Sequence, residues 1–263
     1  MMRRALQHIH ISKPHNPIPY ASAARIQDHF VRANLDYKLA ASAAAPDAPA
    51  SPPPPPTVLT MEMRPVYTFG RRHVDDPDAK RQIERLKTEA PGADCVITQR
   101  GGQVTFHGPG QLVAFPILDI KEYNLRTKWY IYALEHAAIA TLTNDPFHLT
   151  SAQTTDNVGI WLSPTDKIGS VGVHLRRNIS SHGVAVNLST DLTWFEHIVA
   201  CGLPDARAVS VRQRIGEERW QGLESEREGA DMLEWFAGLY VDRLAEQLEC
   251  GVEKVKLEDV YKE

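Results

Sequence analysis

Six short apolar segments have the composition of β-strands, and their order along the chain constrains the fold more than any other feature. Three precede a long helical segment and three follow it: 57–63, 95–100, 111–120, 157–162, 167–175 and 182–188. Strict alternation of strands and helices would favour a parallel sheet, whereas runs of strands favour an antiparallel or mixed sheet. Residues 163–166 join two of the segments and predict a hairpin. We therefore expect an α+β fold.

Three segments, at 20–40, 127–142 and 232–250, show the apolar spacing of helices. In the second segment Ile131, Leu134, Ala138 and Leu142 recur at intervals of three or four residues. With 263 residues, 43% of them apolar, the chain is long enough to bury one large core. We expect residues 1–263 to form a single domain, in which helices flank a mixed or antiparallel sheet.

Two segments differ from the rest of the chain in composition. Residues 41–57 contain no core-forming residue larger than alanine or proline, so we expect a solvated, disordered insert there. Residues 1–27 carry Arg and Lys but no Asp or Glu, which is typical of a mitochondrial targeting segment. An ordinary first strand and helix that lack acidic residues would explain the same composition, and the protein would then be cytoplasmic.

The charge and the cysteines argue against several classes of protein. A net charge of -4 and a pI of about 6.3 provide no basic field for nucleic acid. The sequence contains no run of eighteen apolar residues, so it predicts no membrane-spanning helix. Cys95, Cys201 and Cys250 have no metal-binding or redox spacing, and His107, His182 and Cys201 do not show the short spacing of a zinc site. We expect a reduced compartment and no metal.

The stretch 100–111, with the sequence RGGQVTFHGPGQ, holds four of the sixteen glycines. It does not open a helix as a dinucleotide fingerprint does, and it lacks the Gly-Lys-Ser/Thr of a phosphate-binding loop. Backbone N–H groups of such a loop can receive an anion or a developing oxyanion. A glycine-rich turn with a purely structural role explains the same residues, and this pattern alone leaves both interpretations open.

Residue by residue, this stretch resembles the signature of the lipoyl(octanoyl) transferases. The matching positions are Arg100, Gly101, Gly102, Thr105, Phe106, His107, Gly110 and Gln111. Residues 64–72, 156–188 and 198–205 are similar to further stretches of the same family. The chain departs from the family pattern at Phe115, where the family has a tyrosine, and near 208–211, where a Thr-Ser pair is usual.

Members of this family transfer an octanoyl group from acyl carrier protein to a lysine of lipoate-dependent enzymes. The resemblance implies the catalytic fold of biotin and lipoate ligases, no cofactor, and octanoyl–acyl carrier protein as the donor. It implies lipoyl domains of 2-oxoacid dehydrogenase complexes and the glycine-cleavage carrier protein as acceptors. It also implies a mitochondrial matrix location.

The resemblance implies Cys201 as the nucleophile, which would form an acyl-thioester intermediate, and Lys167 as its nearby cation. It further implies which residues line the acyl pocket and the oxyanion site: Arg100, Gly101, Gly102, Gln103, Val104, Thr105, Phe106, His107, Ser170, Val171, Gly172, Gly183, Val184 and Ala185. Each buried CH₂ group contributes about 0.8 kcal/mol, so the depth of such a pocket can select the length of the acyl chain.

A thiol suits this chemistry, because exchange between thioesters is nearly isoenergetic and the thiolate is a strong nucleophile. An unperturbed thiol has a pKa of about 8.5, and a nearby cation lowers it. His107 and His182 are alternatives to Lys167 as the activating group. We expect Cys95, in an apolar strand, and Cys250, at the end of a helix, to be small buried residues.

Two other functions are compatible with much of this pattern. An ATP-dependent lipoate–protein ligase shares the fold and the acceptor, but it forms an acyl-adenylate and needs no cysteine nucleophile. A non-catalytic module that binds acyl carrier protein would need neither Cys201 nor Lys167.

Overall fold

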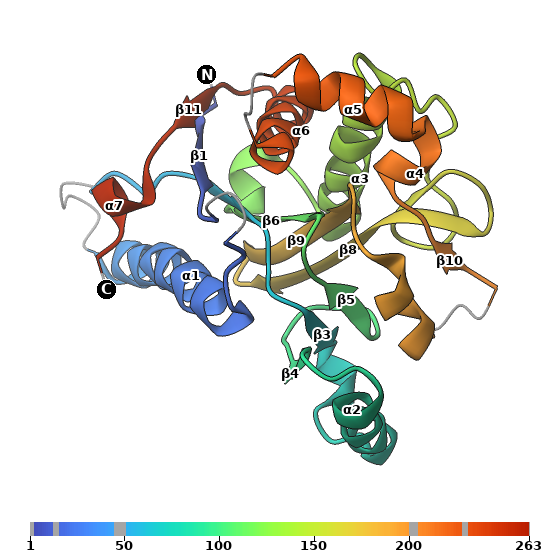
Figure 1. Ribbon diagram of the computed structural model, residues 1–263. Coiled ribbons are helices and arrows are strands. Elements are labelled where there is room, and N and C mark those ends of the chain that lie inside the picture. The colour runs from blue at the N-terminus through green and yellow to red at the C-terminus, as the bar shows by residue number, and fades with distance from the viewer. Residues whose placement is uncertain (1–2, 13–15, 45–50, 200–204, 228–230, 263) are drawn as a thin grey trace.

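The computed structural model describes residues 3–12, 16–44, 51–199, 205–227 and 231–262. A mixed sheet of eight strands lies at its centre, with the order β10–β8–β9–β6–β2–β1–β11 and with β7 paired to β8 (Figure 1). The strands are β1 (Leu6–His10), β2 (Thr57–Met61), β6 (Gln111–Ile117), β7 (Ile160–Trp161), β8 (Asp166–Arg176), β9 (Ile179–Asn187), β10 (Arg207–Ala208) and β11 (Val252–Lys254). In the order β2, β6, β9, β8 each strand is antiparallel to the next, whereas β1 is parallel to β2 and β11, and β10 is parallel to β8.

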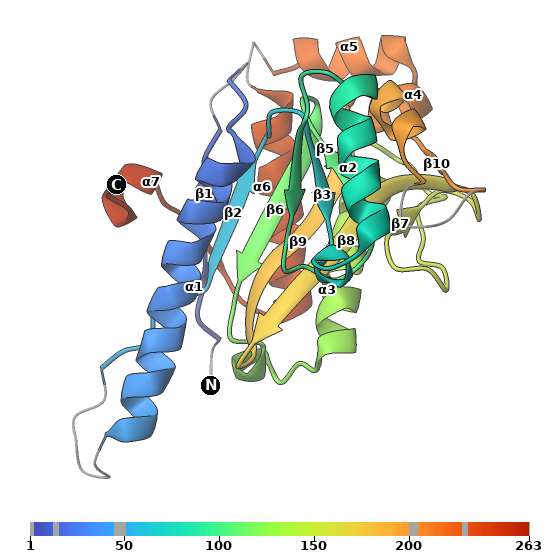
Figure 2. The same ribbon diagram turned by 90° about the horizontal axis from the view of Figure 1, so that it is seen from below.

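Strand β6 explains why some predicted strands are continuously apolar. All seven of its residues are buried, because alternate side chains enter cores on opposite faces of the sheet. Leu112 and Ala114 pack in the core formed with α3 (Thr127–Thr143) and α6 (Met232–Leu248). Val113 and Phe115 pack in the core formed with α1 (Tyr20–Ala43). Helices therefore cover both faces of the central sheet (Figures 1 and 2).

A second sheet of three strands lies below the first in Figure 1. Its strands are β3 (Val66–Phe69), β4 (Asp94–Ile97) and β5 (Thr105–His107), and β3 is central. Helix α2 (Pro77–Glu89) and the 3₁₀ helix η3 (Leu192–His197) contribute side chains to the core of this sheet. The Phe106 ring stacks on that of Trp194, with 5.2 Å between the ring centroids. This small sheet carries the glycine-rich stretch.

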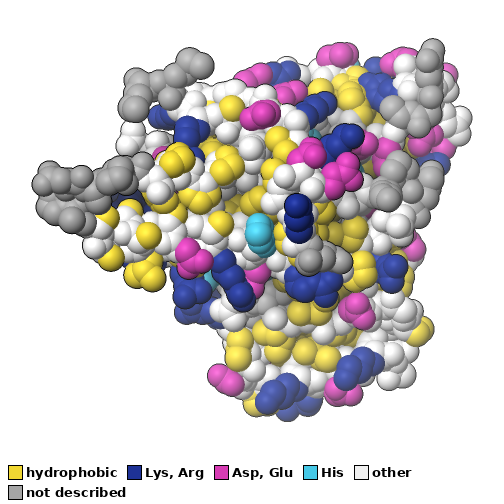
Figure 3. Space-filling view, turned by 90° about the vertical axis from the view of Figure 1, so that its left-hand side faces the viewer, with side chains coloured by type: hydrophobic (Ala, Val, Ile, Leu, Met, Phe, Trp, Pro, Cys, Tyr) yellow, Lys and Arg dark blue, Asp and Glu magenta, His cyan; other side chains and the backbone are white. Residues whose placement is uncertain are grey.

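The remaining elements are short. They are η1 (Arg71–His73), η2 (Ile120–Tyr123), α4 (Val211–Ile215), α5 (Glu217–Ser225) and α7 (Leu257–Val260). Among the helices that the structure describes, none combines the length and the hydropathy needed to span a membrane. On the face that carries α1, Lys and Arg side chains are interspersed with Asp and Glu (Figure 3).

The α+β prediction is confirmed, and all six predicted strands and three predicted helices are present. The predicted hairpin is confirmed too, since β7 and β8 pair in antiparallel fashion. The prediction that the whole stretch 100–111 is a loop is wrong, because Thr105–His107 form strand β5, which pairs with β3. Three residues carry too short a pattern to identify such a strand, and its pairing depends on residues distant in the sequence.

The two segments of unusual composition partly overlap regular elements. Helix α1 extends to Ala43 with its last residues exposed, and Thr57 is a buried residue of β2, so both ends of the predicted insert 41–57 belong to regular elements. Between these ends, Arg4 Nη1 donates to the carbonyl oxygens of Pro53, at 3.0 Å, and Pro54, at 2.7 Å. The acid-free residues 1–27 contain β1 and the start of α1, which are both part of the fold.

Candidate active site

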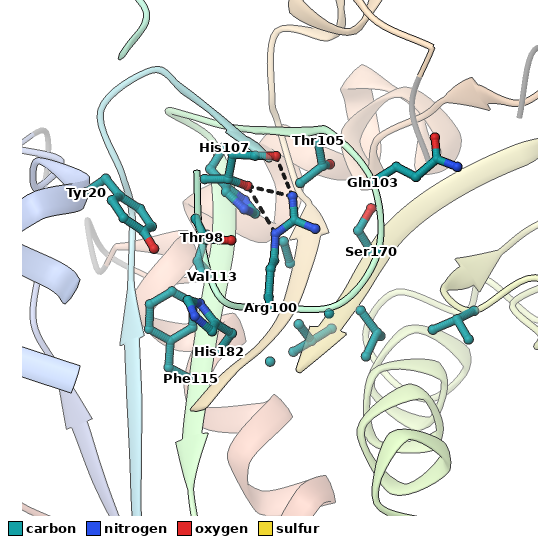
Figure 4. A pocket seen from close by; sticks show the side chains of 18 of the residues that line it. Tyr20, Thr98, Arg100, Gln103, Thr105, His107, Val113, Phe115, Ser170 and His182 are labelled. Atoms are coloured by element: carbon teal, nitrogen blue, oxygen red, sulfur yellow. Dashed lines mark hydrogen bonds between the residues drawn. The ribbon is translucent and has the colours of Figure 1, made fainter. Parts of the chain in front are cut away.

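A cavity of about 200 Å³ opens between the two sheets and the first turn of α1 (Figure 4). Eleven of the fourteen residues predicted for the acyl pocket line it: Arg100, Gly102, Gln103, Thr105, His107, Ser170, Val171, Gly172, Gly183, Val184 and Ala185. The structure places the other three elsewhere. Val104 and Phe106 pack in the core of the small sheet, and Gly101 lines a neighbouring depression beside Val173.

The first half of the glycine-rich stretch is fixed between the two sheets. Arg100 is buried, and its Nη2 donates to Thr68 Oγ1 in β3 at 2.9 Å. Its Nη1 donates to the Gly101 carbonyl at 3.0 Å. The Gly101 N–H in turn donates to the Val173 carbonyl in β8, also at 3.0 Å. These bonds hold residues 100–102 across the cavity.

The second half of the stretch has a structural role. Gly110 has a φ of +76°, which favours glycine, and its N–H donates to Glu62 Oε1 at 2.7 Å. Its carbonyl accepts from the N–H groups of Leu188, at 3.0 Å, and Ser189, at 2.9 Å. Within this half, His107 still lines the cavity, whereas Gly110 fixes a turn.

His107 presents a hydrogen-bond acceptor to the cavity. Its Nδ1 lies 2.7 Å from Gln111 Oε1, while Gln111 Nε2 donates to Asn187 Oδ1 at 2.8 Å. Because the glutamine oxygen can only accept, Nδ1 carries the proton and Nε2 carries a lone pair. Burial lowers the pKa of His107 to about 4. The ring is therefore neutral at pH 7.

His182 lies at the end of the cavity that Phe115 and Tyr20 also line (Figure 4). Its φ is +56° within β9, and its N–H donates to Gln27 Oε1 of α1 at 2.6 Å. Its ring is edge-on to Phe115, with 5.5 Å between centroids. Burial, aided by the positive charge of Arg100, lowers the pKa of His182 to about 3. Burial therefore favours the neutral form of both histidines.

Lys167 is not the exposed residue that its position after a turn favours, because its side chain is buried at the start of β8. Its Nζ lies 4.9 Å from the centroid of the Trp161 ring and donates to the Val158 carbonyl at 3.2 Å. Val158 itself lines the cavity. The hairpin therefore holds a buried ammonium group next to the cavity.

Cys201 lies outside the described residues, but the described chain on each side of it packs at this site. Ile198 packs with Val104 and Phe106. On the other side, Ala208 pairs with Lys167, and the Val209 N–H donates to the Lys167 carbonyl at 2.9 Å. These contacts connect one flank to the glycine-rich stretch and the other to the strand of Lys167.

The other two cysteines are poor nucleophiles. Cys95 and Cys250 are both half-buried, and burial raises the pKa of both thiols. A raised pKa leaves little thiolate at neutral pH. Within the described ranges, no three His, Cys, Asp or Glu side chains are grouped so that they could hold a metal ion.

Comparison with known proteins identifies the family of this chain. Residues 33–227 match the family model described as the lipoyl protein ligase A/B catalytic domain. The chain belongs to this family. A Schizosaccharomyces pombe protein named "Probable octanoyltransferase" is 41% identical over 210 residues, which are 80% of this chain and 88% of that protein. The human protein named "Octanoyl-[acyl-carrier-protein]:protein N-octanoyltransferase LIPT2, mitochondrial" is 36% identical over 198 residues, 75% of this chain and 80% of that protein.

Solved structures show the same fold at much lower identity. A lipoate-protein ligase A bound with ATP aligns with a TM-score of 0.57 and 13% identity, over 97% of this chain and 89% of that one. P. falciparum LipL1 in complex with lipoate aligns with a TM-score of 0.54 and 10% identity, over 97% of this chain and 66% of that one. The predicted ligase-type fold is therefore confirmed.

Several cavity residues of this lipoyl protein ligase A/B family member were not predicted from the sequence. They are Tyr20, Thr68, Arg72, Thr98, Val113, Asn157 and Val158. Four of these lie in the stretches 64–72 and 156–188, so the family resemblance of those stretches could have identified them. Tyr20 begins a helix whose apolar spacing indicates only packing.

Proposed function

We propose that this chain transfers an octanoyl group from octanoyl–acyl carrier protein to a lysine of a lipoyl domain, through a thioester on Cys201. The observation that carries the proposal is the level of identity to relatives named octanoyltransferases, over most of both chains. The retention of Lys167 in a buried, hydrogen-bonded position beside the cavity supports it.

In the first step the Cys201 thiolate attacks the carbonyl carbon of the donor thioester. A new carbon–sulfur bond forms, and the carrier thiolate leaves and takes a proton. In the second step the neutral amine of the acceptor lysine attacks the acyl-enzyme. An amide bond forms, the Cys201 thiolate is released, and the amine loses a proton. Lys167 would stabilise the thiolate by its charge in both steps.

The cavity suits the acyl chain. The central sheet lines it with the small residues Ser170, Gly172, Gly183 and Ala185, which leave a narrow slot between strands and loop. The phenol of Tyr20 and the neutral ring of His182 line it without placing a carboxylate in contact with the chain. Burial of methylene groups there would provide the binding free energy for a medium-length chain.

An octanoyltransferase activity accounts for the similarity to known proteins better than an ATP-dependent lipoate–protein ligase activity does. The likeness to ligase structures, at 13% identity and below, shows only the fold. The more similar relatives carry octanoyltransferase names, and several are named mitochondrial. We further propose a location in the mitochondrial matrix. There the acceptors would be lipoyl domains of 2-oxoacid dehydrogenase complexes and the glycine-cleavage carrier protein.

Incubation of the full chain with octanoyl–acyl carrier protein, followed by intact mass analysis, tests this function. We expect one octanoyl adduct without ATP, and we expect it to disappear when a lipoyl domain is added. Cys201→Ala should give no adduct and no transfer. Cys95→Ala and Cys250→Ala serve as matched controls and should keep both.

Two results would contradict the proposal. Transfer that persists in Cys201→Ala would exclude the thioester route. Transfer that needs ATP and free octanoate would indicate a ligase instead.

A further inference from the structure

The loop that precedes β7 surrounds the Lys167 side chain. The Val158 carbonyl accepts from Lys167 Nζ, and the Trp161 ring lies under the ammonium group. Gly159 has a φ of +140°, and a Cβ atom on it would lie 2.6 Å from Lys167 Cε. The backbone of residues 157–159 therefore fits closely against the lysine, and a small shift of this loop would move the ammonium group.

Two side chains hold this loop from outside. Trp161 Nε1 donates to the Asn157 carbonyl at 3.0 Å. Glu135 Oε1, on α3, accepts from the Gly159 N–H at 2.7 Å. Val158 lies between Asn157 and Gly159, and its carbonyl accepts the hydrogen bond from Lys167 Nζ. The Glu135 carboxylate thus determines, through one peptide unit, where the acceptor for Lys167 lies.

Glu135 is an unusual residue for its place in α3. Eight residues of this helix are buried, and Glu135 is the one among them with a charged side chain. Five of the others are Leu, Ala or Tyr residues that pack in the core between α3, α6 and the central sheet. Burying a carboxylate costs free energy unless hydrogen bonds and a nearby cation offset it. Burial raises the pKa of Glu135, while the Gly159 N–H and the Lys167 charge oppose that rise. An apolar residue would pack here at lower cost, so packing alone does not explain the carboxylate.

We propose that Glu135 is a positioning residue for octanoyl transfer: it fixes the loop 157–159 and thereby holds the Lys167 ammonium in place beside the cavity. This inference rests on the proposed function, because it assigns Glu135 a role only through Lys167. Glu135 is not among the described residues that line the cavity. Its effect should therefore fall on the chemical steps and leave substrate binding unchanged.

Three variants of the full chain test the proposal. Glu135→Leu fills the site with apolar volume but removes the acceptor. Glu135→Gln keeps an oxygen that can accept from Gly159. Thr141→Ala is the matched control, since Thr141 is also buried in α3 but bonds within its own helix, to the Ala137 carbonyl at 2.8 Å. For each variant we would measure kcat, KM for octanoyl–acyl carrier protein, the rate of Cys201 alkylation by iodoacetamide, and the midpoint of thermal unfolding.

We expect Glu135→Leu to lower kcat about ten-fold, equivalent to roughly 1.4 kcal/mol, with KM unchanged and Cys201 alkylation slowed. Glu135→Gln should recover most of this loss, and Thr141→Ala should keep the wild-type kcat. Wild-type kcat and alkylation in Glu135→Leu would overturn the proposal. Equal losses in Glu135→Leu and Thr141→Ala would also overturn it, because they would indicate a general effect on α3. A wild-type chain that forms no octanoyl adduct would instead refute the proposed function.

Discussion

The glycine-rich stretch 100–111 and the β7–β8 hairpin both border the cavity, but they are held in different ways. The glycine-rich stretch is held at several points: the Arg100 side chain bonds to β3, the Gly101 N–H to β8, and the Gly110 N–H to the Glu62 side chain. The loop at the hairpin is held by Trp161 of the hairpin itself and by a side chain from a distant helix, Glu135. The glycine-rich stretch shapes the cavity, whereas the hairpin places the Lys167 ammonium group.

This difference predicts different consequences of substitution. A change in the second half of the glycine-rich stretch should lower the stability of the fold, because the bonds there connect structural elements. A change in the hairpin loop should lower the rate of the chemical steps, because Lys167 rests against that loop. Glycines with positive φ occur in both regions, so the same substitution can be compared between them.

Among the glycine substitutions, Gly159→Ala should have the largest effect on turnover. Its φ of +140° is unfavourable for alanine, and the new Cβ would lie 2.6 Å from Lys167 Cε. We expect kcat to fall at least about ten-fold, since a displaced lysine loses roughly 1.4 kcal/mol or more of stabilisation in the transition state. Gly110→Ala, with a Cβ 2.7 Å from the Ser189 carbonyl carbon, should instead lower the free energy of unfolding by about 1–3 kcal/mol.

Gly238→Ala is the control for both variants. Gly238 lies within α6 and a Cβ there meets no atom within 4 Å, so alanine should stabilise the helix by up to about 1 kcal/mol. Urea unfolding and steady-state kinetics at a temperature where all variants are folded would measure these effects. If Gly110→Ala lowers kcat in the folded protein as much as Gly159→Ala does, the distinction between the two regions is wrong.

At the far end of the cavity, a substitution should change the preference among acyl donors. The register of β6 and β9 pairs Ala114 with Val184, which places Phe115 toward His182 and away from the Lys167 end of β8. Phe115→Ala should deepen the cavity and shift the preference from octanoyl toward decanoyl donors. Two further CH₂ groups contribute at most about 1.6 kcal/mol when buried, or roughly fifteen-fold in the ratio of kcat/KM.

Phe115→Tyr is the matched control, because it keeps the ring and restores the family's hydroxyl. It should leave the octanoyl preference unchanged. An unchanged preference in Phe115→Ala would show that another residue, such as Tyr20, ends the slot.

The sequence predicts those parts of the molecule whose pattern is local. The strands of the central sheet have continuous apolar runs because both faces are covered, and the glycine-rich stretch carries a long family signature. Strands β3 and β5 are too short to show a pattern and depend on pairing with each other. Glu135 gave no signal, because a glutamate in an apolar helix usually lies on the solvent side. Its burial and its bond to Gly159 depend on a loop that is 24 residues away in the chain.

In the proposed mechanism, the hairpin places the Lys167 ammonium where it activates the Cys201 thiol. The most direct test is the rate of iodoacetamide alkylation of Cys201 against pH, in a chain where Cys95 and Cys250 are replaced by alanine. Wild-type Lys167 should give a Cys201 pKa below the free-thiol value of about 8.5, and Lys167→Met should raise it by about one unit or more while the protein stays folded. The same alkylation profile with and without Lys167 would contradict the account.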